Sequence, residues 1–324
     1  MKFTSASAHK ASMILYHAVS SYQLLEAMLH RMLYHETARA VLLLPDFITR
    51  KYPQYQKLAA KHFFDEVYLF PYLHIPHREE KKILEDVSQC YRQRVPHDIS
   101  EFSDFFIAGA HFYFSLYLIE HRLPFVFWED AAGMLSRSKE LYEALRVNFP
   151  IHAEIAQKHG LFDGSNPLVR RIVCLKKAQT KDVSGEKYED FSVERALQAL
   201  PPGKRKKVCR FFLKRRLHTK AEGILLTQHF SNLGMMSEED QKKLYEGLRD
   251  GVLRGKRILI KRHPDDTLDY SKIFPQAEVI RQTFPSELLP YVFRKPPNTI
   301  YTFDSTGCEN LGEQFHILKI RRQS

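Results

Sequence analysis

The chain has 324 residues, of which 44% are hydrophobic, and a formal net charge of +11 at pH 7. This length is more than one hydrophobic core usually holds, so two folded domains are expected, and the hydrophobic content excludes an intrinsically disordered chain. No apolar run approaches the roughly 20 residues that a membrane-spanning helix needs, and residues 1–10 lack the apolar core of a secretory signal.

The first half of the chain alternates short apolar runs with helical patterns. Strands are predicted at 12–17, 40–44, 66–70, 104–109 and 124–128, because each is a short apolar run closed by turn residues. Ser20 is a predicted N-cap for a helix over 20–30, and a mostly polar helix is predicted over 74–92. This order of elements is typical of an α/β domain with a parallel sheet.

Two acidic residues follow the strand at 124–128. Glu129 and Asp130 precede a turn of small residues that ends at Gly133. Adjacent carboxylates at a strand end are suited to general-base chemistry, and burial beside Phe127 and Trp128 would raise the pKa of one of them. The structural alternative is a helix N-cap Asp beside an exposed Glu.

The pattern over residues 142–220 predicts a crossover between the domains, with a helix over 193–200.

The segment from 204 to 216 carries eight basic residues, interrupted by two phenylalanines and a leucine. The basic residues are Lys204, Arg205, Lys206, Lys207, Arg210, Lys214, Arg215 and Arg216. Three interpretations remain open, namely a solvated helix face, a patch that docks on an anionic membrane, and a nucleic-acid contact. No nucleic-acid-binding motif accompanies the charge, so no nucleic-acid partner is expected.

The C-terminal half repeats the alternation of strand and helix. Apolar runs within 223–230, 258–260, 277–280 and 298–303 predict four strands. Ser237 is a predicted N-cap for the helix after the first strand, and Ser286 for a short helix after the third. The pattern predicts a doubly wound parallel sheet.

Polar residues follow three of these strands, and the carboxyl ends of parallel strands meet at one edge of a sheet. That edge is where open α/β sheets bind ligands, and it would gather Gln228 and His229, His263, and Ser305 with Thr306. Pro264 holds His263 on a rigid turn beside two cationic residues, a combination that suits a phosphate or another anion. Ser305 and Thr306 precede a glycine, and at a helix N-terminus they would also bind phosphate. The structural alternatives are a surface histidine in a basic turn and a simple N-cap.

No metal site is predicted. The four cysteines are scattered, and neither they nor the histidines have the spacing of a zinc site. Asp265 and Asp266 directly follow the His-Pro pair, and we expect them to cap the next helix and not to bind a metal ion.

In its order of elements the chain resembles the bacterial sialyltransferases that act on lipooligosaccharide and the related capsule polysialyltransferases. That group is marked by an acidic pair, a His-Pro pair and a late Ser/Thr pair. Here the matching residues are Glu129–Asp130, His263–Pro264 and Ser305–Thr306. Residues 19–25, 225–228 and 285–288 also resemble segments of that group, and the similarity is spread over most of the chain.

The resemblance implies a GT-B fold, an α/β architecture of two Rossmann-like domains whose parallel sheets face a central cleft. Residues 1–165 would bind the acceptor, 166–220 would form the crossover and basic linker, and 221–324 would bind the nucleotide sugar. The implied reaction is an inverting, metal-independent transfer of sialic acid, or a related keto-sugar acid, from a CMP-sugar to a cell-surface glycan such as lipooligosaccharide or capsule. No cofactor is expected.

The resemblance also implies roles for individual residues. His263 would hold the CMP phosphate and assist its departure, and Ser305 and Thr306 would hold the same phosphate. Asp130, or Glu129 in its place, would deprotonate the acceptor hydroxyl. Glu287 would contact the ribose or the cytosine, with Gln228, His229 and Pro264 completing the donor site.

Two alternatives have other partners. One is a GT-B transferase that uses CDP-glycerol or a UDP-sugar in surface polymer synthesis. The other is a non-catalytic basic protein that binds membrane or nucleic acid. The expected location is the cytoplasm, with a possible peripheral contact to the inner face of the plasma membrane through the basic segment.

Overall fold

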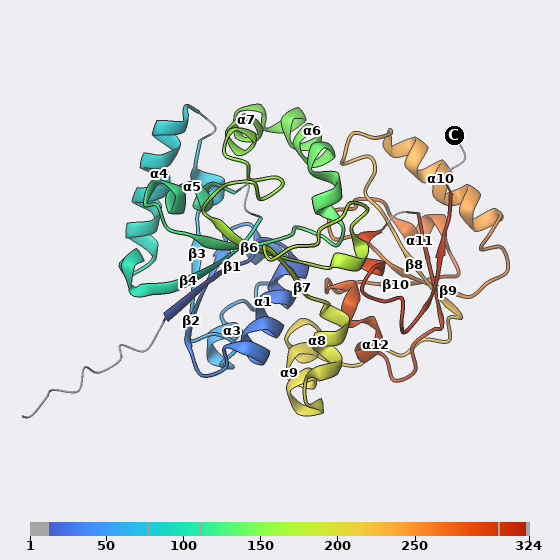
Figure 1. The fold of residues 1–324 in the computed structure, drawn as a ribbon. Coiled ribbons are helices and arrows are strands. Elements are labelled where there is room, and N and C mark those ends of the chain that lie inside the picture. The colour runs from blue at the N-terminus through green and yellow to red at the C-terminus, as the bar shows by residue number, and fades with distance from the viewer. Residues whose placement is uncertain (1–12, 77, 110–111, 304, 322–324) are drawn as a thin grey trace, which may run out of the picture. The chain divides into compact units, whose positions relative to one another are not determined.

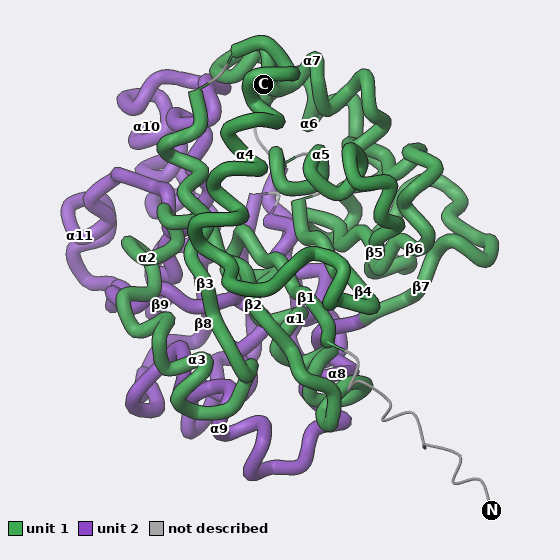
Figure 2. Tube along the Cα trace, turned by 90° about the vertical axis from the view of Figure 1, so that its left-hand side faces the viewer, with its two compact units in different colours: residues 1–191 green, residues 192–324 purple. Residues whose placement is uncertain are grey.

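The computed structural model describes residues 13–76, 78–109, 112–303 and 305–321. The chain forms two compact units, which divide between Phe191 and Ser192 (Figure 2). Each unit contains one parallel sheet with helices beside it (Figure 1). The described residues contain no helix that is both long enough and apolar enough to cross a bilayer.

The sheet of the first unit has seven strands in the order β3-β2-β1-β4-β5-β6-β7, and all neighbouring strands run parallel. The strands are β1 (Met13–His17), β2 (Arg39–Pro45), β3 (Glu66–Phe70), β4 (Phe102–Ala108), β5 (Phe125–Trp128), β6 (Val169–Cys174) and β7 (Tyr188–Asp190). The order reverses between β1 and β4, which are neighbours although two strands separate them in sequence. Such a reversal is the usual ligand position in doubly wound sheets.

Helices cover both faces of this sheet. They are α1 (Ser21–Tyr34), α2 (Ile48–Lys51), α3 (Lys57–Ala60), α4 (Glu80–Arg94), α5 (Tyr113–Glu120), α6 (Ser138–Asn148) and α7 (Pro150–Lys158), with short 3-10 turns η1 (Tyr72–His74), η2 (Ile99–Glu101), η3 (Met134–Arg137) and η4 (Lys176–Ala178). Successive side chains of β1 point to opposite faces of the sheet. Met13 and Leu15 point to one face, where they pack in the cluster that includes α4, α5 and α7. Tyr16 points to the other face, where it contacts His30 of α1 and Phe64.

The sheet of the second unit has five parallel strands in the order β10-β9-β8-β11-β12. They are β8 (Gly223–Leu226), β9 (Ile258–Lys261), β10 (Glu278–Ile280), β11 (Thr299–Thr302) and β12 (His316–Lys319). The helices are α8 (Val193–Ala199), α9 (Pro202–Phe212), α10 (Glu238–Asp250), α11 (Tyr270–Ile273) and α12 (Leu289–Val292), with 3-10 turns η5 (Ser286–Leu288) and η6 (Thr306–Cys308). Here the strand order reverses between β8 and β11.

Most of the elements expected from apolar runs are present, and two expected N-caps are observed. The side chain of Ser20 accepts from the backbone N–H of Gln23, and that of Ser237 from the backbone N–H of Asp240. Ser286 does not act as a cap, because it lies inside η5 and Pro285 holds the N-cap position without a side-chain hydrogen bond. The helix expected to begin at His74 begins at Glu80, since Pro76 disfavours helical geometry in the residue before it.

The boundary between the units differs from the expected one. The expected linker at 166–220 supplies β6 and β7 to the first sheet and α8 and α9 to the second unit. β6 was not predicted because Arg170 and Arg171 interrupt its apolar pattern. Arg170 pairs with Asp104 of β4 at 3.2 Å, and Arg171 pairs with Glu189 of the neighbouring strand β7 at 2.9 Å. The first unit therefore extends to Phe191.

Candidate functional site

The carboxyl ends of four strands in the second unit are level with one another. Lys261 of β9 pairs in register with Leu226 of β8 and with Ile280 of β10, and Leu226 also pairs with Thr302 of β11. The residues that follow these strands therefore emerge at one edge of the sheet. The sequence prediction that Gln228, His263 and Ser305 gather at one edge agrees with this register.

A buried hydrogen-bond network holds the His-Pro turn against the end of β8. The backbone N–H of His263 donates to Thr227 Oγ1 at 3.0 Å, and the same hydroxyl donates to Asp266 Oδ2 at 2.9 Å. Asp266 also accepts from Tyr270 Oη at 2.6 Å and from Gln241 Nε2 at 3.1 Å. Asp266 is therefore a buried acceptor for the residues that hold the His-Pro turn. It is not the helix cap that we expected, because Asp269 caps α11.

The imidazole of His263 lies partly exposed at this edge, with 30% of the side chain accessible. Its Nδ1 accepts a hydrogen bond from the backbone N–H of Asp265 at 3.2 Å. In the neutral ring the proton is then on Nε2, so Nε2 is a hydrogen-bond donor. The ring stacks on His229, with centroids 3.8 Å apart and planes 11° from parallel.

Ser305 and Thr306 stand at the start of η6, after β11. Thr302 Oγ1 accepts from the backbone N–H of Ser305 at 3.0 Å, which fixes the start of this turn. Gly307 lies against η5, because a Cβ atom there would be 3.3 Å from both Cβ and Oγ of Ser286. The structure thus brings the Ser-Thr turn and the turn that contains Glu287 together. Asp304 lies outside the described residues.

Two buried charged residues lie at the same edge. Burial raises the pKa of Glu287 to about 7, and the charge of Lys261 opposes this rise. Burial lowers the pKa of Lys261 to about 8, and the charge of Glu287 opposes this fall. The ammonium of Lys261 lies 4.8 Å from the centre of the Phe284 ring. Lys261 was not among the expected donor-site residues, since its place at the end of an apolar strand gave no sign that its side chain is buried.

Three side chains at this edge have the composition of a metal-binding group. His229, His263 and Asp265 offer ligand atoms that all lie within 4.8 Å of one another. In the neutral His263 ring the protonated Nε2 has no lone pair for a metal ion, and the unprotonated Nδ1 already accepts the backbone N–H of Asp265 at 3.2 Å. This arrangement suits hydrogen-bond donation to an anion better than it suits metal ligation.

In the first unit, Glu129 follows β5 and is completely buried. Its two carboxyl oxygens accept from the backbone N–H of Leu175 and from Gln179 Nε2, both at 2.7 Å. Burial raises the pKa of Glu129 to about 8, although these N–H donors and those of Met134 and Gly133 oppose the rise. Glu129 therefore links the segment after β6 to the end of β5 through hydrogen bonds. Its carboxyl group has no exposed surface for a substrate.

Asp130 is only partly buried and has a different partner. Its Oδ1 accepts from Gln23 Nε2 at 2.7 Å. The Oε1 of Gln23 accepts from the backbone N–H groups of Val19 and Ser20, each at 3.2 Å, so the turn after β1 orients the amide. Gly109, at the end of β4, has a φ of +60°, and a Cβ there would be 3.1 Å from Asp130 Oδ1. Asp130 therefore lies at the β1–β4 reversal.

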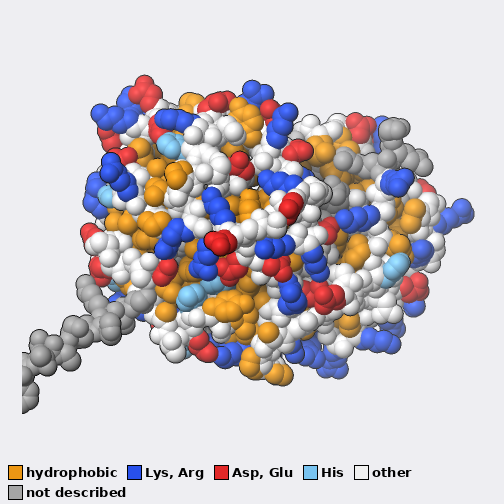
Figure 3. Space-filling model, in the orientation of Figure 1, with side chains coloured by type: hydrophobic (Ala, Val, Ile, Leu, Met, Phe, Trp, Pro, Cys, Tyr) orange, Lys and Arg blue, Asp and Glu red, His pale blue; other side chains and the backbone are white. Residues whose placement is uncertain are grey.

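The basic segment forms α9 and the irregular stretch after it. Phe211, Phe212 and Leu213 are each 5% exposed. Six of the eight cations, all except Lys204 and Lys207, line a groove of about 940 Å³ between α9 and α12, together with Arg294 and His218. Figure 3 shows Lys and Arg side chains at the lower edge of the view, in the region where Figure 1 draws α9 and α12. The apolar side chains Phe211, Phe212 and Leu213 are therefore buried and do not face solvent.

Three supporting residues were missed by reasoning from sequence. Thr227 and Asp266 hold the His263 turn, and Gln23 holds Asp130. A signal was present for Gln23, since Ser20 and Gln23 have the spacing of a capping box. Nothing in the local sequence distinguishes Asp266 from Asp265, because only the tertiary structure buries one and exposes the other.

No family model matches the chain. An "uncharacterized protein" of Haemophilus influenzae is 35% identical over 84 residues, which are 26% of this chain and 27% of that protein. The aligned stretch thus spans about a quarter of that relative.

Solved structures match nearly the whole chain. The Staphylococcus aureus MnaA–UDP structure has a TM-score of 0.57 at 12% identity and covers 96% of this chain and 79% of its own. A Methanocaldococcus jannaschii UDP-GlcNAc 2-epimerase with UDP-GlcNAc and UDP has a TM-score of 0.54 at 12% identity, covering 92% and 80%. The glycotransferase of kitacinnamycin has a TM-score of 0.53 at 13% identity, covering 96% and 81%. With these likenesses and its two parallel sheets, the chain has the GT-B fold.

Proposed function

We propose that the protein is an inverting, metal-independent glycosyltransferase that transfers sialic acid, or a related keto-sugar acid, from a CMP-sugar to a cell-surface glycan. The observation that carries the proposal is the edge of the second sheet. There the Nε2 of His263, the Ser305–Thr306 turn and buried Glu287 follow strands whose ends are in register. The acceptor would be a glycan or glycolipid such as lipooligosaccharide or capsule.

The donor half of the proposal follows from the charge that develops in the reaction. When the bond between the sugar and the phosphate breaks, CMP leaves with the bonding electron pair. Fixed hydrogen-bond donors lower the barrier when they point to the atom where this charge appears. His263 Nε2 is such a donor, because the backbone of Asp265 fixes the tautomer and Thr227 fixes the turn. Ser305 and Thr306 supply hydroxyl groups after β11, at the same edge of the sheet.

The acceptor half assigns the base to Asp130. The acceptor hydroxyl attacks the anomeric carbon and passes its proton to the carboxylate, while CMP departs from the opposite side. A base must reach the substrate, and Asp130 has exposed surface whereas Glu129 has none. We therefore assign Glu129 a structural role and Asp130 the proton transfer.

UDP-sugars are the second candidate donor. Two of the three structural neighbours described above contain UDP or a UDP-sugar, which favours this alternative over CDP-glycerol. The same fold also occurs in a nucleotide-sugar epimerase, since one neighbour is a UDP-GlcNAc 2-epimerase. An epimerase would convert its nucleotide sugar without any acceptor.

Nucleotide protection tests the donor. The full-length protein would be heated with CMP, CDP, UMP or UDP, each with EDTA and each with magnesium, and its melting temperature recorded. A ligand at 100 times its Kd stabilises a folded protein by about 2.7 kcal/mol, which is a measurable shift. We expect the largest shift with CMP and the same shift in EDTA. A larger shift with UDP would replace the CMP-sugar by a UDP-sugar, and a shift that requires magnesium would overturn the metal-independent mechanism.

Such an enzyme would work where its nucleotide sugar is made. We therefore place it in the cytoplasm, at the inner face of the plasma membrane when the acceptor is lipid-linked. Fractionation of cells that express the tagged protein tests this placement. Recovery outside the cytoplasmic and inner-membrane fractions would contradict it.

A further inference from the structure

The groove between α9 and α12 has a uniform charge. Arg210, Lys214, Arg215 and Arg216 line it together with Arg294 near α12, and no Asp or Glu among the described residues lines it. Those five side chains are exposed. Bringing so many cations together without a carboxylate destabilises the fold by mutual repulsion. The arrangement is therefore typical of a site for an anionic ligand.

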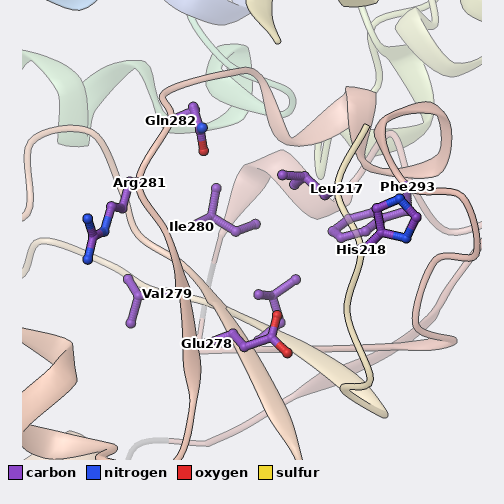
Figure 4. Close-up of a pocket in the computed structure, with 9 residues that line it drawn as sticks. Leu217, His218, Glu278, Val279, Ile280, Arg281, Gln282 and Phe293 are labelled. Atoms are coloured by element: carbon purple, nitrogen blue, oxygen red, sulfur yellow. The ribbon is translucent and has the colours of Figure 1, made fainter. Parts of the chain in front are cut away.

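The groove has a defined position and limits. Its α12 wall includes Tyr291, which follows Glu287 by four residues, on the order of 6 Å of helical chain. The guanidinium of Arg205 covers Tyr291, 4.9 Å from the ring centre. At the other end His218 and Phe293 also line a smaller pocket, of about 230 Å³, in which Glu278 and Arg281 lie (Figure 4). The purely basic lining thus ends at His218.

The type of cation and the shape of the groove indicate the ligand. Arginine predominates, and its planar guanidinium donates two parallel hydrogen bonds to a phosphate or a carboxylate. A membrane-bound helix needs apolar side chains that face outward, but Phe211 and Phe212 are buried. Single-stranded nucleic acid needs exposed aromatic rings for stacking, but Phe293 is 3% exposed and Arg205 covers Tyr291.

We infer that this groove binds the anionic part of the acceptor glycan, through phosphate or carboxylate groups on sugars remote from the reacting hydroxyl. The inference rests on the proposed transferase function and adds the class of acceptor, a glycan with several negative charges. Binding of a remote charged group raises the occupancy of the acceptor without contact between the groove and the reacting atoms. The groove therefore selects the acceptor and takes no part in bond breaking.

The test compares two triple variants of the full-length chain. Arg210→Gln, Arg215→Gln and Arg216→Gln together neutralise the groove. Lys242→Gln, Lys243→Gln and Lys272→Gln together remove the same number of charges from α10 and α11 of the same unit, outside the groove. The probes are deacylated lipooligosaccharide with its phosphates and the same glycan after chemical dephosphorylation, with affinities measured by calorimetry.

We expect the unmodified protein to bind the phosphorylated probe at least about tenfold more tightly than the dephosphorylated one, because each charge-assisted hydrogen bond is stronger than a neutral one. The groove variant should lose this difference, and the α10–α11 variant should keep it. Equal binding of the two probes by the unmodified protein, or equal losses in both variants, would overturn the inference.

Two further measurements separate this inference from its competitors. Stronger groove-dependent binding to phosphatidylglycerol vesicles or to a single-stranded DNA oligonucleotide than to the glycan would replace the glycan by a membrane or a nucleic acid. Stabilisation by CMP should be the same in the groove variant as in the unmodified protein. If CMP has no effect on either protein while the glycan still binds, the donor proposal fails and the groove assignment stands.

Discussion

Gln23 Nε2 donates to Asp130 Oδ1 at 2.7 Å, across a sequence separation of 107 residues. The same amide accepts two backbone N–H groups of the turn after β1, so its orientation is fixed from the other side. Two strand ends that flank β4 are thereby joined through one side chain. Asp130 is held by the first helix of its unit as well as by its own strand.

Gln23→Glu tests whether this contact positions the base. The new carboxylate keeps the acceptor for Val19 and Ser20 but places a second negative charge beside Asp130 in place of a donor. We expect transfer to fall on the order of 100-fold, the effect of displacing a reacting group by about 1 Å, with the change in kcat and not in the KM for the donor. Ser20→Ala is the matched control, because it removes the helix cap at a cost of about 1 kcal/mol in the free energy of unfolding and leaves Gln23 in place. Equal losses of kcat in both variants would mean that only the helix end matters.

Asp130→Asn tests the base itself. An amide of the same shape cannot take the proton, so we expect transfer to fall by roughly 100-fold to 10,000-fold, the range for loss of a general base. The melting-temperature shift with CMP should not change, because the nucleotide is assigned to the second unit. Initial rates at saturating donor measure the loss. Near-normal turnover in this variant would show that the acidic pair is structural.

His263→Ala removes the proposed donor to the leaving phosphate. The side chain is partly exposed and its backbone N–H still reaches Thr227, so folding should be unaffected. We expect a loss of turnover on the order of 100-fold or more and a smaller stabilisation by CMP. His263→Gln, whose amide can still donate, should restore part of both. His229→Ala serves as the comparison, since it removes the stacked ring and leaves the His263 hydrogen bond. Unchanged turnover in His263→Ala would make this histidine a simple turn residue.

Glu129 predicts a pH dependence of stability. Burial raises the pKa of this carboxyl from 4.5 to about 8 in the folded protein. Between pH 4.5 and pH 8 the folded state binds a proton that the unfolded state has released. The contribution of Glu129 to the free energy of unfolding is therefore complete below pH 4.5 and is lost as the pH rises through 8. Glu287, with a pKa raised to about 7, adds a dependence of the same sign. His30 acts in the opposite direction below its ordinary pKa, because burial lowers its pKa to about 3.

Glu129→Gln isolates the contribution of Glu129. Urea unfolding of the variant should show a smaller decline in the free energy of unfolding from pH 5 to pH 8 than the unmodified protein shows, because glutamine does not titrate. Glu287 and His30 are unchanged in both proteins and cancel in the comparison. If the free energy of unfolding has the same pH dependence in both proteins, Glu129 is ionised throughout this range. Its N–H donors favour that ionised form.

The sequence by itself determined those features that local patterns encode. Each apolar run that ends in turn residues forms a strand, because burial on both faces of a parallel sheet requires continuous apolar side chains. Ser20 and Ser237 mark helix starts because a hydroxyl that accepts from the first turn is a local interaction. The common edge for Gln228, His263 and Ser305 also follows, since parallel strands place all their carboxyl ends on one side.

The tertiary structure alone decided the features that depend on distant partners. β6 is recognisable only when Arg170 and Arg171 are seen beside Asp104 and Glu189. Phe211 and Phe212 interrupt a basic segment in the sequence, yet both side chains are buried.

The same is true of the two acidic pairs. Glu129 and Asp130 are equivalent in the sequence, as are Asp265 and Asp266. Packing buries Glu129 and Asp266 with buried hydrogen-bond donors and leaves Asp130 and Asp265 with exposed surface. Desolvation is a property of the surroundings that the fold provides. Which member of each pair can meet a substrate is therefore set by packing and not by the residues themselves.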